Sequence, residues 1–217
     1  MSPQQAADRF IARQIAYYRA RASEFDLSHH QPTPELRAAL ERFSPRGSVL
    51  ELACGTGIWT AEILRHPVDE LTCIDAAPEM LEIHAANIRD PRVRRERHDL
   101  FGWESDDRYD AVIFAFWLSH VPPSRFPEFW GAVQRALKPG GRVFFVDDDD
   151  RAEVTEERIP EAEVPAVLRT LDDGTPHVAI KLFHEPQALA EDLRALGWTA
   201  DVQSAGARFL WGTATPP

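Results

Sequence analysis

This sequence lacks any hydrophobic run near the roughly 20 residues that a membrane-spanning helix needs. It also lacks the basic and apolar regions of a secretory signal at its amino terminus, which reads Met-Ser-Pro-Gln-Gln. Both absences lead us to expect a cytoplasmic protein with no membrane partner. The 217 residues are 44% hydrophobic, which is enough for one globular domain with a sizeable core.

Cysteine is scarce, since Cys54 and Cys73 are the only two. Both fall at the ends of expected buried strands, which favours small core residues over a disulfide, and no histidine cluster accompanies them as zinc ligands. The acidic run from Asp147 to Asp150 is typical of a solvated loop, because consecutive side chains point to opposite faces. We therefore predict no metal site.

Basic residues are fewer than acidic ones, 24 against 35, which gives a formal net charge of −11. A field of that sign repels phosphate backbones, so we expect no nucleic-acid partner. The one dense basic stretch, Arg92–Arg97, fits a strand with a solvated charged face and does not by itself indicate a nucleic-acid site. The sequence does not indicate an oligomeric state.

Apolar runs and helical segments alternate between residues 48 and 147, which predicts a doubly wound α/β sheet with helices on both faces. The run Val112–Phe116 is continuously apolar, as in a buried central strand. The expected strands cover 48–53, 71–75, 93–98, 110–116 and 142–147, and the expected helices cover 58–66, 78–87 and 124–137.

The segments on either side of this core predict two additions. Helical spacing over 4–25 and again over 34–43 predicts an N-terminal helical lid in residues 1–46, ahead of a main domain in residues 47–217. Residues 148–184 are expected to form an inserted loop and hairpin on the substrate side. The expected hairpin arms are 166–171 and 178–183, followed by a helix over 186–196 and two strands at 199–204 and 207–212.

The segment Val49–Gly57 is an apolar strand that runs into a loop of small residues, and a helical segment follows it. This order places backbone N–H groups and a helix N-terminus at one sheet edge, where the polar end of a nucleotide-like ligand binds. Asp75 ends the next apolar run, close to the roughly 20-residue spacing at which an acidic residue meets ribose hydroxyls. Thr60 stands where a dinucleotide fingerprint has its third glycine, which weighs against a nicotinamide cofactor.

The segment Glu51–Gly57 resembles motif I of the class I S-adenosylmethionine-dependent methyltransferases, E/D-x-G-x-G-x-G, with Ala53 replacing the first glycine. Further blocks follow in the family's order at Cys73–Leu81, His98–Phe101, Tyr109–Phe114 and Leu137–Val143. The resemblance implies a Rossmann-like seven-stranded sheet, mostly parallel with an antiparallel last strand. It also implies S-adenosyl-L-methionine as the cofactor and S-adenosyl-L-homocysteine as its product.

The resemblance implies contacts along the cofactor. Glu51 would order the amino group, Asp75 would bind the ribose hydroxyls, and Asp99 would accept a hydrogen bond from the adenine amine. Alternative roles are a Glu51 satisfied by loop N–H groups, a helix-capping Asp75 and a loop-capping Asp99. The implied cofactor-binding residues are Tyr18, Glu51, Ala53, Gly55, Gly57, Asp75, Ala76, Met80, Asp99, Leu100 and Phe116.

The segment Tyr18–Asp26 resembles the Y-x-x-x-A-x-x-Y-D segment of small-molecule methyltransferases, with Phe25 in place of the second tyrosine. This likeness implies a lid helix whose Tyr18 reaches the carboxylate of the cofactor. Tyr17 and Arg21 are its neighbours.

His120 is the candidate general base, because it follows the fourth strand at the ligand-facing edge and imidazole titrates near neutrality. A structural histidine that orients this loop is the alternative. Trp117 is a candidate for stacking on the substrate, or else a core residue. Arg169 and Lys181 are candidates for binding an anionic substrate, or else exposed hairpin charges.

Phe116–Ser119 stands where methyltransferases of nucleic-acid amines carry an N/D-P-P-Y/F tetrad, which points away from those substrates. We therefore expect methyl transfer to oxygen or nitrogen of a small-molecule acceptor. A nicotinamide-dependent oxidoreductase and a non-catalytic protein that binds S-adenosylmethionine are the alternatives.

Overall fold

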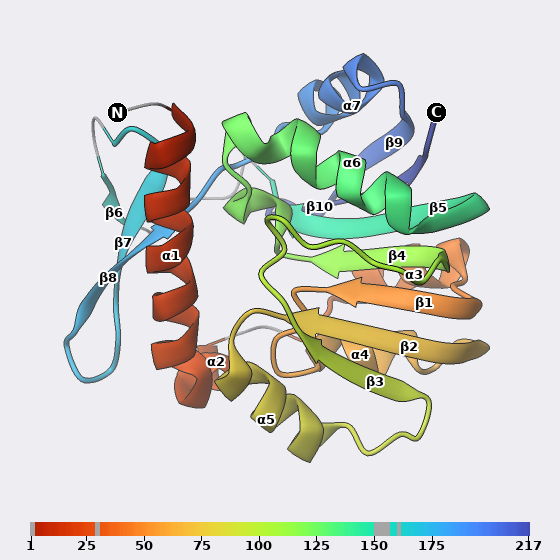
Figure 1. Ribbon diagram of the computed structural model, residues 1–217, viewed down its shortest axis with the longest axis horizontal. Coiled ribbons are helices and arrows are strands. Elements are labelled where there is room, and N and C mark those ends of the chain that lie inside the picture. The colour runs from red at the N-terminus through yellow and green to blue at the C-terminus, as the bar shows by residue number, and fades with distance from the viewer. Residues whose placement is uncertain (1–2, 29–30, 150–156, 160–161) are drawn as a thin grey trace.

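The computed structural model describes residues 3–28, 31–149, 157–159 and 162–217, and its centre is a seven-stranded sheet in the order β3-β2-β1-β4-β5-β10-β9 (Figure 1). Strand β10 alone runs opposite to the other six strands, so its pairs with β5 and β9 are antiparallel and the remaining pairs are parallel, as predicted. The strands are β1 (Gly47–Leu52), β2 (Val68–Asp75), β3 (Val93–Arg97), β4 (Tyr109–Ala115), β5 (Leu137–Asp148), β9 (Thr199–Ala205) and β10 (Phe209–Thr215).

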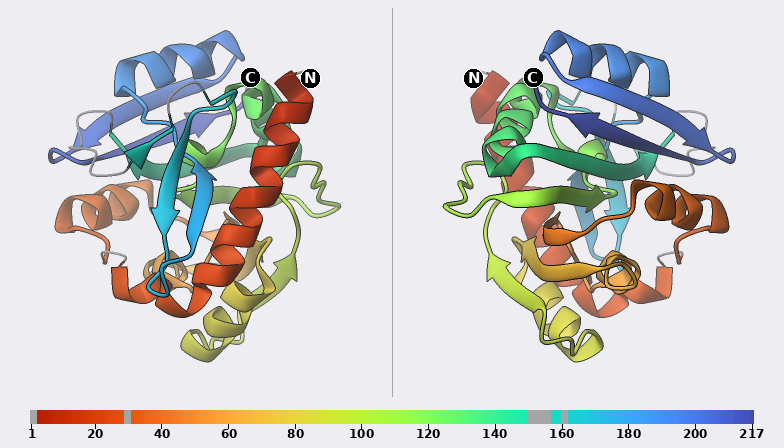
Figure 2. Two further views of the ribbon diagram at one scale, coloured as in Figure 1. Left: turned by 90° about the vertical axis from the view of Figure 1, so that its left-hand side faces the viewer. Right: turned by 90° about the vertical axis from the view of Figure 1, so that its right-hand side faces the viewer.

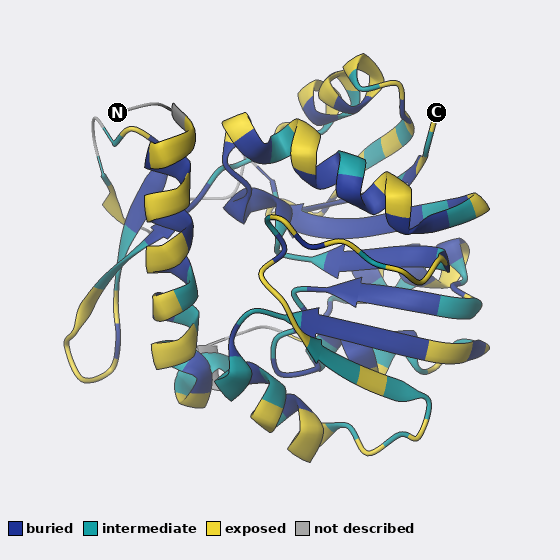
Figure 3. Ribbon diagram, viewed as in Figure 1, coloured by how far each residue is buried: buried dark blue, intermediate teal, exposed yellow. Residues whose placement is uncertain are grey.

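Helices cover both faces of this sheet, and each face has its own buried core. Helices α3 (Pro34–Phe43) and α4 (Ile58–Ile63) pack on one face, and α6 (Phe126–Ala136) and α7 (Pro186–Ala195) pack on the other. Helix α5 (Pro78–Asn87) lies beside β2 and β3. Figure 3 shows the central strands buried along most of their length, as expected for a doubly wound sheet.

A lid stands across the sheet edge to which the arrowheads of β1 to β4 point (Figures 1 and 2). It consists of α1 (Pro3–Arg21), a short turn of helix η1 (Ala22–Glu24), α2 (Phe25–Ser28) and a separate three-stranded sheet. Phe10 and Ile11 of α1 pack against Ala166 and Ile180 of that sheet. The strands of the small sheet are β6 (Glu157–Arg158), β7 (Ala166–Thr170) and β8 (Pro176–Ile180).

The predicted hairpin is therefore present as β7 and β8, and Cys54 and Cys73 are buried free thiols as expected. The sequence pattern did not predict β6, a two-residue strand that pairs with β7 and lies in the loop expected ahead of the hairpin in the inserted segment 148–184. Residues 150–156 and 160–161 of that loop lie outside the described part of the chain.

Strand β5 begins at Leu137, where a helix was expected to end, because Leu137 pairs with Tyr109 before the ladder shifts register. Two short turns of helix, η2 (Leu118–His120) and η3 (Pro123–Arg125), connect β4 to α6. Within the described residues, no helix has both the length and the apolar character needed to cross a membrane.

Candidate active site

A cavity of about 300 Å³ lies between the carboxyl ends of the sheet strands and the lid. The cavity opens at the carboxyl ends of β1 and β4, which are neighbours in the sheet. The strand order reverses between these two strands, and doubly wound sheets usually bind their ligands at such a switch point. All the residues predicted for the site line it except Gly57. The predicted lining residues are Tyr18, Glu51, Ala53, Gly55, Asp75, Ala76, Met80, Asp99, Leu100, Phe116, Trp117, His120, Arg169 and Lys181.

The loop after β1 turns sharply back toward the cavity. Ala53 and Gly55 have positive φ values of 53° and 54°, so Ala53 occupies a conformation that suits glycine better. Gly57 has a φ of 97° and is the N-cap residue of α4. A Cβ built on Gly57 would come within 2.8 Å of Ile88 Cγ1, which shows that this glycine faces α5 rather than the cavity.

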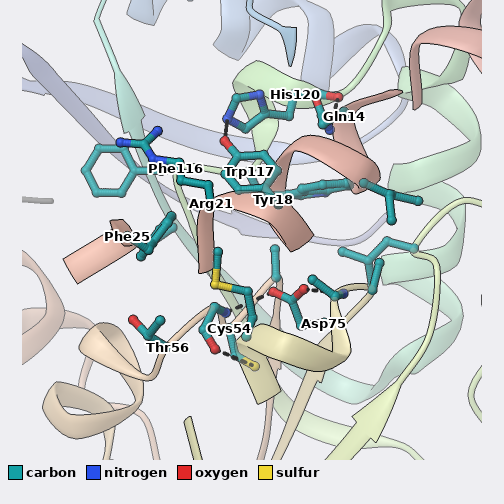
Figure 4. A pocket seen from close by; sticks show the side chains of 18 of the residues that line it. Gln14, Tyr18, Arg21, Phe25, Cys54, Thr56, Asp75, Phe116, Trp117 and His120 are labelled. Carbon is teal, nitrogen blue, oxygen red and sulfur yellow. Dashed lines mark hydrogen bonds between the residues drawn. The ribbon is translucent and has the colours of Figure 1, made fainter. Parts of the chain in front are cut away.

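Asp75 closes this loop from the end of β2 (Figure 4). Its Oδ2 accepts a hydrogen bond from the Gly55 N–H at 2.9 Å, and its Oδ1 accepts one from the Ala77 N–H at 2.8 Å. Burial raises the pKa of the Asp75 carboxyl, while these N–H groups lower it in part. Each carboxylate oxygen has a second lone pair, so Asp75 retains acceptor capacity for ligand hydroxyls.

Glu51 lies deeper in the cavity wall and is only 2% exposed. The Thr60 hydroxyl donates to its Oε2 at 2.5 Å, and the Cys73 thiol donates to the same oxygen at 3.5 Å. Burial raises the pKa of Glu51 to about 7.

Another part of the cavity wall is apolar, and it includes the buried side chains of Met80 and Leu100. Asp99 lies at its rim and accepts a hydrogen bond from the Phe101 N–H at 3.0 Å. A flat apolar ligand fits between such residues, with a carboxylate at its edge.

Tyr18 and His120 meet on the lid side of the cavity (Figure 4). The His120 Nδ1 lies 2.6 Å from the carbonyl oxygen of Ile180 and must carry a proton, because a carbonyl only accepts. In the neutral ring, the His120 Nε2 therefore accepts from the Tyr18 hydroxyl at 2.8 Å. Arg169 donates to that same hydroxyl at 3.3 Å, which places a cation beside the pair.

Lys181 is buried, with 7% exposure, rather than an exposed hairpin charge. It forms an ion pair with Asp148 and donates to the Ser119 hydroxyl at 3.1 Å. Burial alone would lower the pKa of Lys181, but the carboxylates of Asp147 and Asp148 raise it above its usual value. The lysine is therefore charged at the cavity wall.

Two aromatic residues follow β4 and line the cavity. Phe116 has a φ of 56°, an unusual conformation for a bulky residue, which directs the chain into η2. Trp117 packs on Phe101 and Phe129, and its buried indole N–H has no hydrogen-bond partner among the described residues. Trp117 therefore belongs both to the cavity wall and to the core.

Gln14, which was not predicted from the sequence, is 2% exposed and connects the lid to the site. Its amide accepts from the Ile180 N–H at 3.2 Å and donates to the His120 carbonyl at 3.5 Å. A polar residue on the apolar stripe of α1, between Ile11 and Ile15, was the available signal. Phe25, Asp148 and Arg208 also line the cavity and were not predicted.

The chain is similar in sequence to known methyltransferases. A family model described as a methyltransferase domain matches residues 49–141. The ubiquinone biosynthesis O-methyltransferase of Acinetobacter baumannii (strain ACICU) is 33% identical over 157 residues, which make up 70% of this chain. The match covers 63% of that relative, so the chain spans less than two thirds of its length.

Solved structures give a longer match. The DhpI–SAM–HEP complex has a TM-score of 0.82 and 40% sequence identity, covering 95% of this chain and 98% of that one. The DhpI–SAH complex has a TM-score of 0.80, also with 40% identity, and covers 95% of this chain and 97% of that one. These matches include the lid as well as the sheet.

Proposed function

Because the chain belongs to the class I S-adenosylmethionine-dependent methyltransferases, we propose that it transfers a methyl group to an oxygen or nitrogen atom of a small anionic acceptor. The observation that carries this proposal is the division of the cavity. Its sheet side presents the carboxylates of Asp75 and Glu51, and its lid side presents His120, Arg169 and Lys181.

The sheet side fits S-adenosylmethionine in shape and in chemistry. Asp75 would hold the ribose hydroxyls, since its oxygens keep acceptor capacity beyond the loop N–H groups. A Cβ on Gly55 would lie 3.8 Å from the Phe25 ring, so the missing side chain leaves room beside the lid. Glu51 would accept from the amino group, and Met80 would lie against the adenine.

When bound, S-adenosylmethionine supplies a methyl group on a sulfonium, and the protein must align an acceptor with it and exclude water. The lid, which consists of α1, η1, α2 and the three-stranded sheet, would enclose the acceptor against the sheet edge. His120 Nε2 is placed to take a proton from an acceptor hydroxyl or amine, either directly in place of Tyr18 or through the Tyr18 hydroxyl.

An anionic group on the acceptor would add a negative charge beside the guanidinium groups on the lid side, where Lys181 is already paired with Asp148. The guanidinium of Arg169 touches Tyr18, and the buried ammonium of Lys181 lies on the same wall. Arg21 also lines the cavity from α1. Carboxylate or phosphate oxygens are the groups that such cations bind best.

Calorimetric titration tests the cofactor first, with S-adenosylmethionine, S-adenosylhomocysteine and NADH on the wild type and on Asp75→Ala. We expect micromolar binding of the two sulfur ligands, lost in the variant, and no binding of NADH. Preference for NADH would contradict the proposal.

An acceptor screen then compares hydroxy compounds that carry a carboxylate or phosphate with neutral alcohols of the same size, using methyl-labelled cofactor. We expect transfer to the charged members and a higher KM for them in Arg169→Gln. Equal rates with charged and neutral compounds would contradict the anionic acceptor, and cofactor binding without transfer to any member would favour a non-catalytic role.

A further inference from the structure

A line of buried side chains reaches Glu51 from behind the cavity. Thr60 of α4 and His84 of α5 are both 0% exposed, and the half-buried Arg95 of β3 ends the line near the surface. None of these three residues lines the cavity. Thr60 contacts Glu51 directly, and His84 and Arg95 extend the line behind it.

The hydrogen bonds along this line have a fixed direction. Arg95 Nε donates to His84 Nδ1 at 2.7 Å, since a guanidinium has only donors. The proton of the neutral His84 ring is then on Nε2, which donates to the Thr60 hydroxyl at 2.9 Å. The Thr60 hydroxyl has its own proton left for Glu51 Oε2, at 2.5 Å.

The His84 ring stays neutral, which keeps this direction fixed. Burial lowers the pKa of His84 to about 4, and the Arg95 charge contributes in the same sense. Arg95 also donates to the Ile88 carbonyl at 2.5 Å, which holds the guanidinium at the end of α5. A cation at one end and a carboxylate at the other orient every hydroxyl and ring proton between them.

Gly57 makes room for this line. A Cβ at this position would lie 3.3 Å from His84 Cδ2 and 2.8 Å from Ile88 Cγ1. The glycine that stands outside the cavity therefore allows α5 to approach α4 closely enough for His84 to reach Thr60.

The same place has the composition of a metal site, because one ligand atom each from Glu51, Cys73 and His84 lie within 4.8 Å of one another. The Arg95 contact argues against a metal there. A metal on His84 Nε2 would require the ring proton on Nδ1, where it would face a guanidinium donor.

We propose that Thr60, His84 and Arg95 are positioning residues that hold Glu51 for the amino group of the cofactor. Both side-chain donors to Glu51 bind Oε2, and no described residue donates to Oε1. The line therefore fixes one carboxylate oxygen and leaves the other for an ammonium group. This inference rests on the proposed function, because it assumes that an amino-acid end of the ligand binds at Glu51.

The test compares two ligands that differ only at the amino group: S-adenosylhomocysteine and its deaminated analogue, in which hydrogen replaces the amine. Calorimetry on the full chain uses Thr60→Val, which keeps the shape of the side chain and removes the hydroxyl. Thr72→Val is the matched control, since Thr72 is a buried threonine on β2 that accepts from Arg94 at 3.3 Å. Thermal melts confirm that each variant folds.

We expect Thr60→Val to weaken S-adenosylhomocysteine binding by about tenfold to a hundredfold, as for a lost hydrogen bond to a charged group. Binding of the deaminated analogue should stay within about twofold of the wild type, and Thr72→Val should leave both ligands unchanged. Arg95→Gln should weaken binding in the same ligand-selective way by about threefold, with Arg94→Gln as its control.

Equal losses for both ligands in Thr60→Val would overturn the positioning role and indicate a general packing defect. Stoichiometric zinc in the purified wild type would also overturn it. If the wild type failed to bind either ligand, the cofactor assignment itself would fail, which is a different outcome from a loss of selectivity.

Discussion

The Tyr18 hydroxyl of α1 donates a hydrogen bond of 2.8 Å to His120 Nε2 in the turn after β4. The lid and the sheet edge therefore meet at the imidazole nitrogen that we propose as the general base. Gln14 supports this contact from the same helix by binding the His120 carbonyl. Closure of α1 over the cavity and orientation of the imidazole are thus parts of one arrangement.

We predict that the effects of His120→Gln and Tyr18→Phe on kcat are not additive. Loss of a positioned base lowers kcat by about a hundredfold or more, and Tyr18→Phe should cost about tenfold because the ring loses its partner. The double variant should resemble His120→Gln alone, since Tyr18 acts through the histidine. Binding of S-adenosylhomocysteine to His120→Gln, measured by calorimetry, is the control and should change little. Additive losses would show that the two side chains act separately.

Asp75→Asn should abolish most cofactor affinity without unfolding the chain. An amide keeps one acceptor oxygen, which cannot serve the Gly55 N–H, the Ala77 N–H and two ribose hydroxyls together. We expect S-adenosylhomocysteine to bind about a hundredfold more weakly, by calorimetry. Asp99→Asn is the comparison. Because Asp99 lies at the rim of the cavity, this substitution should weaken S-adenosylhomocysteine binding by about tenfold or less. Equal losses in the two variants would argue against a special role for Asp75.

Gly57→Ala should destabilise the fold by about 2–3 kcal/mol, since a positive φ costs about 1–2 kcal/mol for alanine and overpacking adds to it. Its Cβ would press on Ile88 at 2.8 Å. Gly174→Ala is the matched control: this glycine has a φ of 86° in the turn between β7 and β8, with no atom within 4 Å of an added Cβ. The free energy of unfolding in urea is measured for both variants. Gly174→Ala reports the cost of the positive φ alone, and the additional loss in Gly57→Ala reports the cost of the contact with Ile88. Equal losses would mean that α5 shifts freely away from the loop.

The sheet could be predicted because its signals are local. Continuous apolar runs mark β4 and β5, and the loop from Glu51 to Gly57 lies next to Asp75 only because β1 and β2 are parallel neighbours. The glycine loop after β1 and the acidic residue at the end of β2 must then meet at the same edge of the sheet.

The side-chain partners could not be predicted, because they join residues that are distant in the chain. Arg95 belongs to a basic stretch that fits a solvated strand face, yet its guanidinium reaches the buried His84 ring. Lys181 looks like a hairpin charge, and only the fold of the inserted segment buries it beside Asp148. Periodicity determines which face a residue occupies, but tertiary packing determines what that face meets.

Cofactor binding should depend on pH through Glu51. Burial, with a smaller contribution from the Asp75 charge, raises the pKa of this carboxyl to about 7, although hydrogen bonds from Thr60 and Cys73 lower it in part. A ligand ammonium group binds the ionised form, so affinity should increase as the pH rises through 7. From about pH 6 to about pH 8 we expect roughly a tenfold gain for S-adenosylhomocysteine, before its own amine loses its proton.

The sign of this effect gives two further observables. Because an ammonium ligand lowers the pKa of Glu51, binding near pH 6 should release protons, which calorimetry detects by repeating the titration in buffers of different ionisation enthalpy. The deaminated analogue should show neither proton release nor the tenfold gain. Thr60→Val should shift the midpoint to higher pH, because it removes a hydrogen bond that favours the carboxylate. A pH-independent affinity for S-adenosylhomocysteine would mean that Glu51 is not the group that meets the amine.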